Sequence, residues 1–146
     1  MALTDVLDVR VYGQPLAQRR PRVRVVQPKE RKPFAHVYED PADKDWKRTV
    51  ILQVLPKKPP APVEGPLAMT LRFFLPRPIS LPARERYHTR KPDLSNLAKS
   101  VEDALRGIVY RDDAQLVRLT VEKHYDPAPG VAIQIERVVA QLELAR

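Results

Sequence analysis

The chain has 146 residues, 43% of them hydrophobic, which is sufficient for one hydrophobic core and excludes an intrinsically disordered chain. It has no apolar run near the roughly 20 residues of a membrane-spanning helix, no N-terminus typical of a signal peptide, and no cysteine for disulfides or thiolate metal sites. The formal net charge of +8 favours a polyanionic partner, most often a nucleic acid, although a ribosomal or membrane-surface protein is also compatible with it.

The positive charge is concentrated near the N-terminus. Eight Lys or Arg residues and one acid, Glu30, lie between Arg10 and Lys32, so this window carries most of the net charge. Acidic residues gather instead between Asp93 and Asp113. A basic segment that binds phosphates and a separate acidic cluster that binds cations are the two parts that a metal-dependent nuclease needs.

The N-terminal third is predicted to contain a strand, a basic loop and a short hairpin. Alternating valines predict the strand over residues 6–12, and Gly and Pro end it. Residues 14–22 form a loop rich in Arg and Pro. Residues 23–26 and 35–38 are short extended segments that fit a ragged hairpin.

A helix is predicted to follow this hairpin. Asp40 can cap the free amides of the first turn, and Pro41 suits the first helical position. Trp46 lies on the apolar face at helical spacing, and the helix must end before Pro56. Residues 57–66 are proline-rich and predict a surface loop.

The central part of the chain predicts a strand, a loop and a second helix. Strict alternation predicts a strand over residues 67–75, and residues 77–92 lack any period and predict a long basic loop. Apolar residues at helical spacing predict a helix that begins after Asp93 and ends at Gly107. Its polar face is expected to carry Asn96, Lys99, Ser100 and Asp103.

The C-terminal part predicts two strands joined by a turn. The strands cover residues 117–125 and 131–135, and the turn covers residues 126–130. Residues 139–146 fit either a strand extension or a short helix. Because strands and helices are mixed without strict βαβ alternation, we predict an α+β fold in which two main helices pack on one face of a mixed sheet. We expect residues 1–146 to form a single domain.

Five polar residues in the last part of the chain are candidates for chemistry. Asp93 precedes the second helix, Lys99 and Asp103 are neighbours on its surface, and Asp112 and Asp113 come directly before a strand. Aspartates with a nearby lysine suit phosphodiester hydrolysis, since magnesium prefers carboxylate oxygens and a lysine can offset phosphate charge. Spacing alone favours a purely structural interpretation, in which Asp93 caps a helix, Lys99 and Asp103 form a surface ion pair, and Asp112 and Asp113 form a turn.

Motifs around these residues resemble those of a known nuclease family. Residues 91–99 read KPDLSNLAK, residues 102–105 read EDAL, and residues 107–116 read GIVYRDDAQL. They are similar to the signature of the RusA family of Holliday-junction resolvases, which reads approximately K-P-D-x-D-N-x-x-K, D-A-L-x-G and D-D-x-Q-I. Residues 12–15 (YGQP) and 20–22 (RPR) match the opening G-x-P and R-P-R of that family.

The resemblance implies a homodimeric endodeoxyribonuclease that cuts four-way DNA junctions symmetrically, with Mg²⁺ as cofactor and Mn²⁺ as the alternative cation. By position, Asp93 and Asp113 would be metal ligands, and Lys99 would be the essential lysine near the scissile phosphate. Asp112 adjoins a ligand and would share the site, and Asp103 matches the aspartate of D-A-L and is a further candidate ligand. The function implied is junction resolution in recombination and repair by a cytoplasmic, nucleoid-associated protein, with no small-molecule substrate and no membrane partner.

One position departs from the family pattern. The second aspartate of the K-P-D-x-D-N motif is Ser95 here, which brings a hydroxyl but no negative charge. The chain would then cut slowly, need more metal, or recruit Asp103 or Asp112 as the missing ligand. Two alternatives stay open: a junction-binding protein that has lost cleavage, and a basic RNA-binding protein.

Basic residues in two segments are candidates for contacts with DNA phosphates. Such contacts position DNA without reading its sequence and make binding sensitive to salt. The alternative for the first segment is a solvated basic hairpin. The candidates are Arg19, Arg20, Arg22 and Arg24 in the first segment, and Arg90 and Lys91 in the second.

Overall fold

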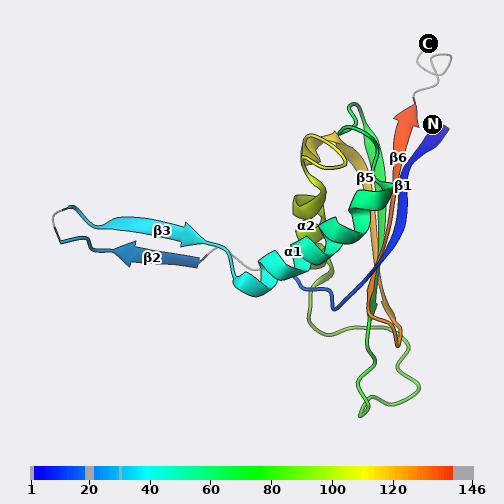
Figure 1. Cartoon of the computed structure of the whole chain (residues 1–146). Helices are drawn as coiled ribbons and strands as arrows, with labels where there is room; N and C mark the ends of the chain where they lie inside the picture. The colour runs from blue at the N-terminus through cyan, green and yellow to red at the C-terminus, as the bar shows by residue number, and fades with distance from the viewer. Residues whose placement is uncertain (1, 19–21, 30, 140–146) are drawn as a thin grey trace.

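The computed structural model describes residues 2–18, 22–29 and 31–139 and has mixed α and β elements (Figure 1). No helix among these residues is long and apolar enough to cross a membrane. The strands are β1 (Ala2–Tyr12), β2 (Arg22–Val26), β3 (Phe34–Tyr38), β4 (Leu67–Leu75), β5 (Leu116–Tyr125) and β6 (Gly130–Val139). The helices are α1 (Pro41–Val54) and α2 (Leu94–Leu105), with short 3₁₀ turns η1 (Leu55–Lys57) and η2 (Asp113–Gln115).

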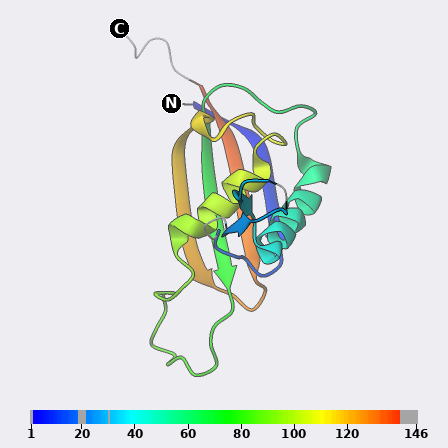
Figure 2. The ribbon, with the colours of Figure 1, turned by 90° about the vertical axis from the view of Figure 1, so that its left-hand side faces the viewer.

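Four strands form one mixed sheet in the order β1-β6-β4-β5. β4 runs parallel to β5, whereas the β1–β6 and β4–β6 pairs are antiparallel. Both helices lie on one face of this sheet (Figure 2). The predicted α+β architecture, with two main helices on one face of a mixed sheet, is confirmed.

The helix α1 begins where the sequence predicts. Asp40 is the N-cap, and its carboxylate accepts a hydrogen bond of 2.9 Å from the amide of Ala42. Trp46, Val50 and Val54 are buried on the face that packs on the sheet and on α2. The α-helix ends before Pro56, which lies in the 3₁₀ turn η1.

The helix α2 carries most of the candidate site. Leu97, Val101 and Leu105 are fully buried and fix this helix against the sheet. The prediction that Ser100 belongs to the polar face is wrong, since it is only 2% exposed. A hydroxyl is small enough to be accommodated on the packed side of a helix. Gly107 follows the helix with a φ of 82°, a conformation that favours glycine.

The predicted hairpin exists and stands away from the sheet. β2 and β3 pair only with each other within the described residues, from Arg22 opposite Tyr38 to Val26 opposite Phe34. Figure 1 shows the hairpin projecting from the N-terminal end of α1, far from β5. We call this hairpin and its turn (22–38) the basic arm.

Two strands are longer than predicted. β1 begins at Ala2 instead of residue 6, and β6 continues to Val139 instead of residue 135, because the two strands pair along their whole length. Polar residues in β1 interrupt the apolar pattern, but an edge strand tolerates them on its solvated face. The predicted ending over residues 139–146 lies outside the described residues except for Val139, which is the last residue of β6.

The predicted long loop leaves the sheet after β4 (Figure 2). Arg77 donates hydrogen bonds to the backbone oxygens of Glu85 and Pro82 within this loop. The ammonium of Lys123 in β5 donates to the backbone oxygens of Arg90 and Pro92, at 3.1 Å each. These contacts return the chain to the sheet directly before α2, which fixes where the second helix begins.

Candidate functional site

Two predicted site residues meet on the surface of α2. Lys99 and Asp103 are one turn apart, and the ammonium nitrogen lies 3.3 Å from Oδ1 of the aspartate. Arg106, directly after the helix, places Nη1 at 3.7 Å from the same oxygen. Lys47 of α1 reaches Oδ2 of Asp103 at 4.0 Å. Three cationic side chains therefore lie near Asp103: one from α1, one from α2 and one from the residue directly after α2.

The turn η2 adds a second carboxylate to this cluster. Oδ2 of Asp113 lies 3.7 Å from Nζ of Lys99 and accepts a hydrogen bond of 3.2 Å from Nη1 of Arg106. The side chains of Asp103 and Asp113 are 13% and 20% exposed, so both carboxylates are largely withdrawn from water. We call Lys99, Asp103, Arg106 and Asp113 the charged cluster.

The loop that presents Asp113 is held by its neighbours. Asp112 is the N-cap of η2, and its carboxylate accepts from the amide of Ala114 at 3.0 Å. The side-chain oxygen of Gln115 accepts from the amides of Arg111 and Asp112, and its nitrogen donates to the backbone oxygens of Val63 and Gly65. Asp112 thus has a structural role in this turn, whether or not it also shares a metal.

The electrostatics of the cluster follow from burial and from charge. The nearby Asp103 carboxylate raises the pKa of Lys99, which therefore stays protonated. Burial, and then the charges of Asp113 and Asp103, raise the pKa of Glu102, which lies next to Asp103 in α2. Burial and the charge of Asp113 also raise the pKa of the buried Tyr110, whose hydroxyl donates to the backbone oxygen of Glu102 at 2.8 Å.

The carboxylates of the cluster suit a hard divalent cation. Oδ1 of Asp103 and Oδ1 of Asp113 are buried and accept no hydrogen bond from the described residues, although Oδ1 of Asp103 forms ion pairs with Lys99 and Arg106. Such oxygens are ligands that magnesium prefers, and magnesium needs only one or two carboxylates beside substrate oxygens and water. The described residues contain no ready group of three or more His, Asp or Glu that could hold a metal. Asp103 and Asp113 are thus two carboxylates that could contribute to a cation site, but they are not a complete set of protein ligands.

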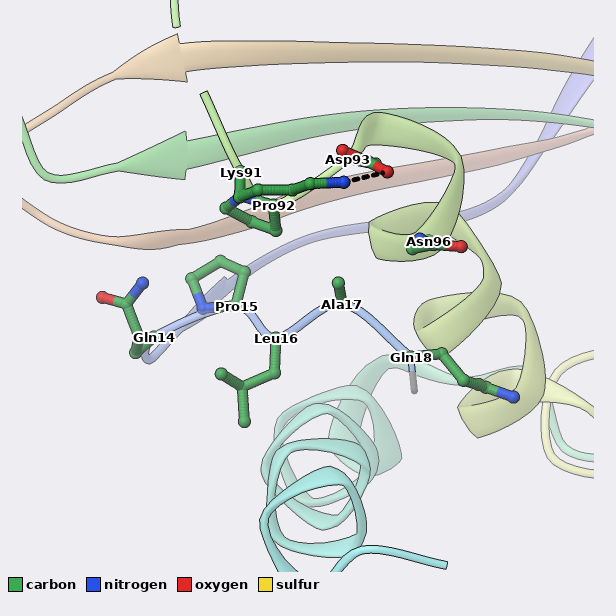
Figure 3. A pocket seen from close by; sticks show the side chains of 9 residues that line it. All are labelled: Gln14, Pro15, Leu16, Ala17, Gln18, Lys91, Pro92, Asp93 and Asn96. Atoms are coloured by element: carbon green, nitrogen blue, oxygen red, sulfur yellow. Dashed lines mark hydrogen bonds and ion pairs between the residues drawn. The ribbon is translucent and has the colours of Figure 1, made fainter. Parts of the chain in front are cut away.

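Asp93 lies elsewhere, at the beginning of α2. It is the N-cap, but its carboxylate makes no capping hydrogen bond and instead accepts from the ammonium of Lys91 at 2.8 Å. It lines a cavity of about 670 Å³ between residues 14–18 and the beginning of the helix, shown in Figure 3. The backbone amide of Gln18 donates a hydrogen bond of 3.0 Å to the backbone oxygen of Asn96, which joins the two walls of the cavity. Two of the motif segments that suggested a nuclease therefore line one cavity.

The structure does not bring all the predicted ligands together. Lys99, Asp103 and Asp113 are in contact, whereas Asp93 and Asp103 are separated by about 15 Å along the helix, at 1.5 Å per residue. A second cavity, of about 600 Å³, lies between α2 and β5 and is lined in part by Ser95, Lys99 and Glu102. The roles of Asp93, Asp103, Asp112, Asp113 and Lys99 stay predictions.

The predicted DNA-binding residues that the structure describes lie in two places. Arg19 and Arg20 lie outside the described residues, and the backbone of Arg22 and Arg24 lies in β2 of the basic arm. Arg90 and Lys91 are exposed at the end of the long loop, beside Asp93. Further basic residues of the arm that are exposed are Lys29, Arg31 and Lys32.

Sequence reasoning missed several residues of the site. Arg106 lies three residues after Asp103, and Glu102 lies three residues after Lys99, so helical spacing could have identified both. Lys47 belongs to the other helix, and no local signal connects it with Asp103. Gln115 was noted only as a motif residue, although it holds the turn that carries the predicted ligand.

Comparisons with known proteins identify the family of the chain. Residues 12–136 match the family described as "Endodeoxyribonuclease RusA". The chain is also 32% identical over 146 residues to "Uncharacterized protein YqaN" of Bacillus subtilis (strain 168), a match that covers 93% of this chain and 99% of that protein. The chain therefore belongs to the RusA family of endodeoxyribonucleases, for which the family activity is Holliday-junction resolution.

Proposed function

We propose that this protein resolves four-way DNA junctions by magnesium-dependent hydrolysis at the charged cluster, with manganese as a possible substitute. The observation that carries the proposal is the contact of Lys99 with both Asp103 and Asp113, at 3.3 and 3.7 Å, in a member of a junction-resolvase family. A bound divalent cation would activate water and offset the charge of the phosphate. Asp113 and Asp103 would hold it here, and Asp93 would be a further ligand if DNA or a second subunit brings it near.

The reaction would be hydrolysis of one phosphodiester bond in each of two strands. The oxygen of water forms a bond to phosphorus, the bond from phosphorus to the 3′ oxygen breaks, and that oxygen leaves with a proton as a 3′-hydroxyl. The other product is a 5′-phosphate end. Lys99 stays protonated beside Asp103 and would stabilise the negative charge that grows on the phosphate oxygens.

The proposed symmetric cutting would require a homodimer as the active form. A four-way junction has two-fold symmetry, and two related nicks need two related sites, which an isologous dimer provides. We expect the protein to act in recombination and repair, in the cytoplasm and close to the nucleoid, because that is where its branched DNA substrate forms.

The serine at position 95 supports one alternative. Ser95 lines the same cavity as Lys99, so an aspartate here would add negative charge close to the catalytic lysine. Without it, the protein would bind junctions and cut them slowly or not at all. This junction-binding alternative differs from the first proposal only in the rate of cleavage, so a cleavage assay separates the two.

The direct test compares wild type with Asp113→Asn on a labelled synthetic junction in magnesium or manganese. We expect wild type to nick the junction, and Asp113→Asn to bind it with similar affinity but to cut at least about 100-fold more slowly, since one ligand charge is removed at the reacting phosphate. Arg111→Gln, which removes an exposed arginine paired with Glu64, is the matched control and should cut normally. Equal cleavage by wild type and Asp113→Asn would sink the assignment of this site.

A further inference from the structure

Arg106 occupies the position in the cluster where a divalent cation would be expected. Its Nη1 lies 3.2 Å from Oδ2 of Asp113 and 3.7 Å from Oδ1 of Asp103, so one guanidinium joins the two candidate ligands. The side chain is also 50% exposed, so its outer nitrogens remain open to solvent. A guanidinium that bridges two carboxylates holds them close together and neutralises part of their charge.

The cluster is neutralised by side chains alone. Lys99 contacts both aspartates, Lys47 contacts Asp103, and Arg106 contacts both aspartates. A divalent cation that binds Asp103 and Asp113 must therefore compete with cationic groups that are already present. Lys99 is the expected catalytic lysine, and Lys47 also pairs with Glu39, which lies just before α1. Arg106 is the cation that contacts both aspartates and has no other role in the proposed reaction.

We propose that Arg106 is an exchangeable counter-ion of Asp113 and Asp103 that moves to a DNA phosphate when DNA binds and so makes these carboxylates available to the metal. This inference rests on the proposed function. Arginine binds phosphate and carboxylate with the same bidentate geometry, so a phosphate oxygen near the cluster is a suitable new partner. Its long, half-exposed side chain can turn outward without moving the buried face of α2.

The movement of Arg106 between the carboxylates and a DNA phosphate couples metal binding to DNA binding. Removing Arg106 from the carboxylates raises their affinity for a cation, and a cation at the carboxylates releases Arg106 for phosphate. Because such coupling is reciprocal, DNA must strengthen metal binding by the same factor by which the metal strengthens DNA binding. Arg106 is thus a positioning residue that would restrict metal loading, and therefore cleavage, to the DNA complex.

The test measures Mn²⁺ affinity, by the decrease of the free Mn²⁺ EPR signal, in the absence of DNA and with an excess of four-way junction held at low temperature. For the free protein we expect Arg106→Gln to bind Mn²⁺ about threefold to tenfold more tightly than wild type, which is the range that two half-exposed ion pairs can supply. With junction present we expect wild type to gain affinity by a similar factor and Arg106→Gln to gain much less. The junction affinity of Arg106→Gln, measured in Mn²⁺, should fall.

Two controls separate this exchange from a purely structural role. Arg111→Gln removes an exposed arginine near the same turn and should leave Mn²⁺ affinity unchanged in both conditions. Arg106→Lys keeps the charge but not the planar guanidinium, and its Mn²⁺ affinity should lie between those of wild type and Arg106→Gln. Thermal melting of each variant checks that it is folded.

The outcomes distinguish this inference from the proposed function. If wild type binds Mn²⁺ and Arg106→Gln binds it no more tightly without DNA, the exchange is wrong while the metal-dependent function stands. If DNA strengthens Mn²⁺ binding equally in both proteins, the coupling through Arg106 is also wrong. If neither protein binds Mn²⁺ with or without junction, the proposed metal-dependent function fails and the inference fails with it.

Discussion

Glu102 lies between the buried face of α2 and the charged cluster, and its environment favours the protonated form. Burial first, and the charges of Asp113 and Asp103 next, raise the pKa of this carboxyl, while Lys99 opposes them. A carboxyl whose pKa is higher in the folded than in the unfolded protein makes folding less favourable as the pH rises through that interval. Its neutral isostere, glutamine, avoids this cost.

We therefore predict that Glu102→Gln raises the melting temperature at pH 7.5 in metal-free buffer, and that the gain shrinks as the pH is lowered through the raised pKa of Glu102 toward the ordinary glutamate value of 4.5. Calorimetric or fluorescence melts at several pH values measure the difference in melting temperature between Glu102→Gln and wild type. The same series for Glu64→Gln controls for the removal of an exposed carboxylate. A gain that is constant or grows toward acid pH would contradict the described surroundings of Glu102.

Part of the charged cluster was predictable from local spacing and part was not. Lys99 and Asp103 are neighbours because they share a helix, and the sequence predicted this contact. That Asp113 joins them depends on the turn at Gly107 and on the anchoring of Gln115 to residues 63–65, which no local pattern reveals. Asp113 therefore contacts Lys99 and Arg106 toward the C-terminal end of α2, whereas Asp93 lies at the beginning of this helix.

At the scale of elements, the pairing of β1 with β6 depends on one close approach. Tyr12 pairs with Gly130 at the beginning of β6, and a Cβ on Gly130 would lie 2.0 Å from the backbone oxygen of Val11. No real contact is that short, so the two strands would have to separate locally. The register that positions Val131 in the core beside Val11 would be strained.

We predict that Gly130→Ala lowers the free energy of unfolding by about 1–3 kcal/mol, the usual cost of forcing extra atoms into a packed region. Urea denaturation measures the change. Ala128→Ser, at an exposed position two residues before Gly130, is the control and should change stability by less than about 0.5 kcal/mol. Full stability of Gly130→Ala would mean that the β1–β6 register differs from the described one.

The helices and the central strand could be predicted well because their signals are local. Asp40 and Pro41 mark the start of α1, and strict alternation marks β4. The ends of β1 and β6 could not be predicted, since they are set by mutual pairing between segments more than 100 residues apart. The two-stranded arm was predicted, but local patterns do not reveal that, within the described residues, β2 and β3 form a sheet separate from the four-stranded one.

At the scale of the whole molecule, charge is separated in space as well as in sequence. The basic arm (22–38) projects from one end of α1 (Figure 1), whereas the residues of the charged cluster lie in α2, directly after it and in the turn η2. An isolated two-stranded hairpin is marginally stable in water and gains stability from a partner. A strongly basic hairpin of this kind fits the phosphate backbone of a duplex arm of the proposed junction.

We predict that neutralising Lys29, Arg31 and Lys32 to glutamine weakens junction binding and lowers the slope of log K against log salt by about 0.9 for each phosphate that the arm no longer neutralises. Fluorescence anisotropy at several salt concentrations in EDTA measures it without cleavage. Replacing Lys57 and Lys58, at the opposite end of α1 from the arm, is the control and should leave the slope nearly unchanged. An unaltered slope for the arm variant would exclude the arm from the DNA interface.

The most direct test of the whole account is nicking of a strand-labelled four-way junction in magnesium by wild type and by Ser95→Asp. We predict paired, symmetric nicks by wild type and an equal or faster rate for Ser95→Asp, because the aspartate restores a carboxylate beside Lys99. Cleavage by Ser95→Asp alone would mean that the native protein binds junctions without resolving them. No cleavage by either protein, and no preference for the junction over linear duplex, would contradict the account.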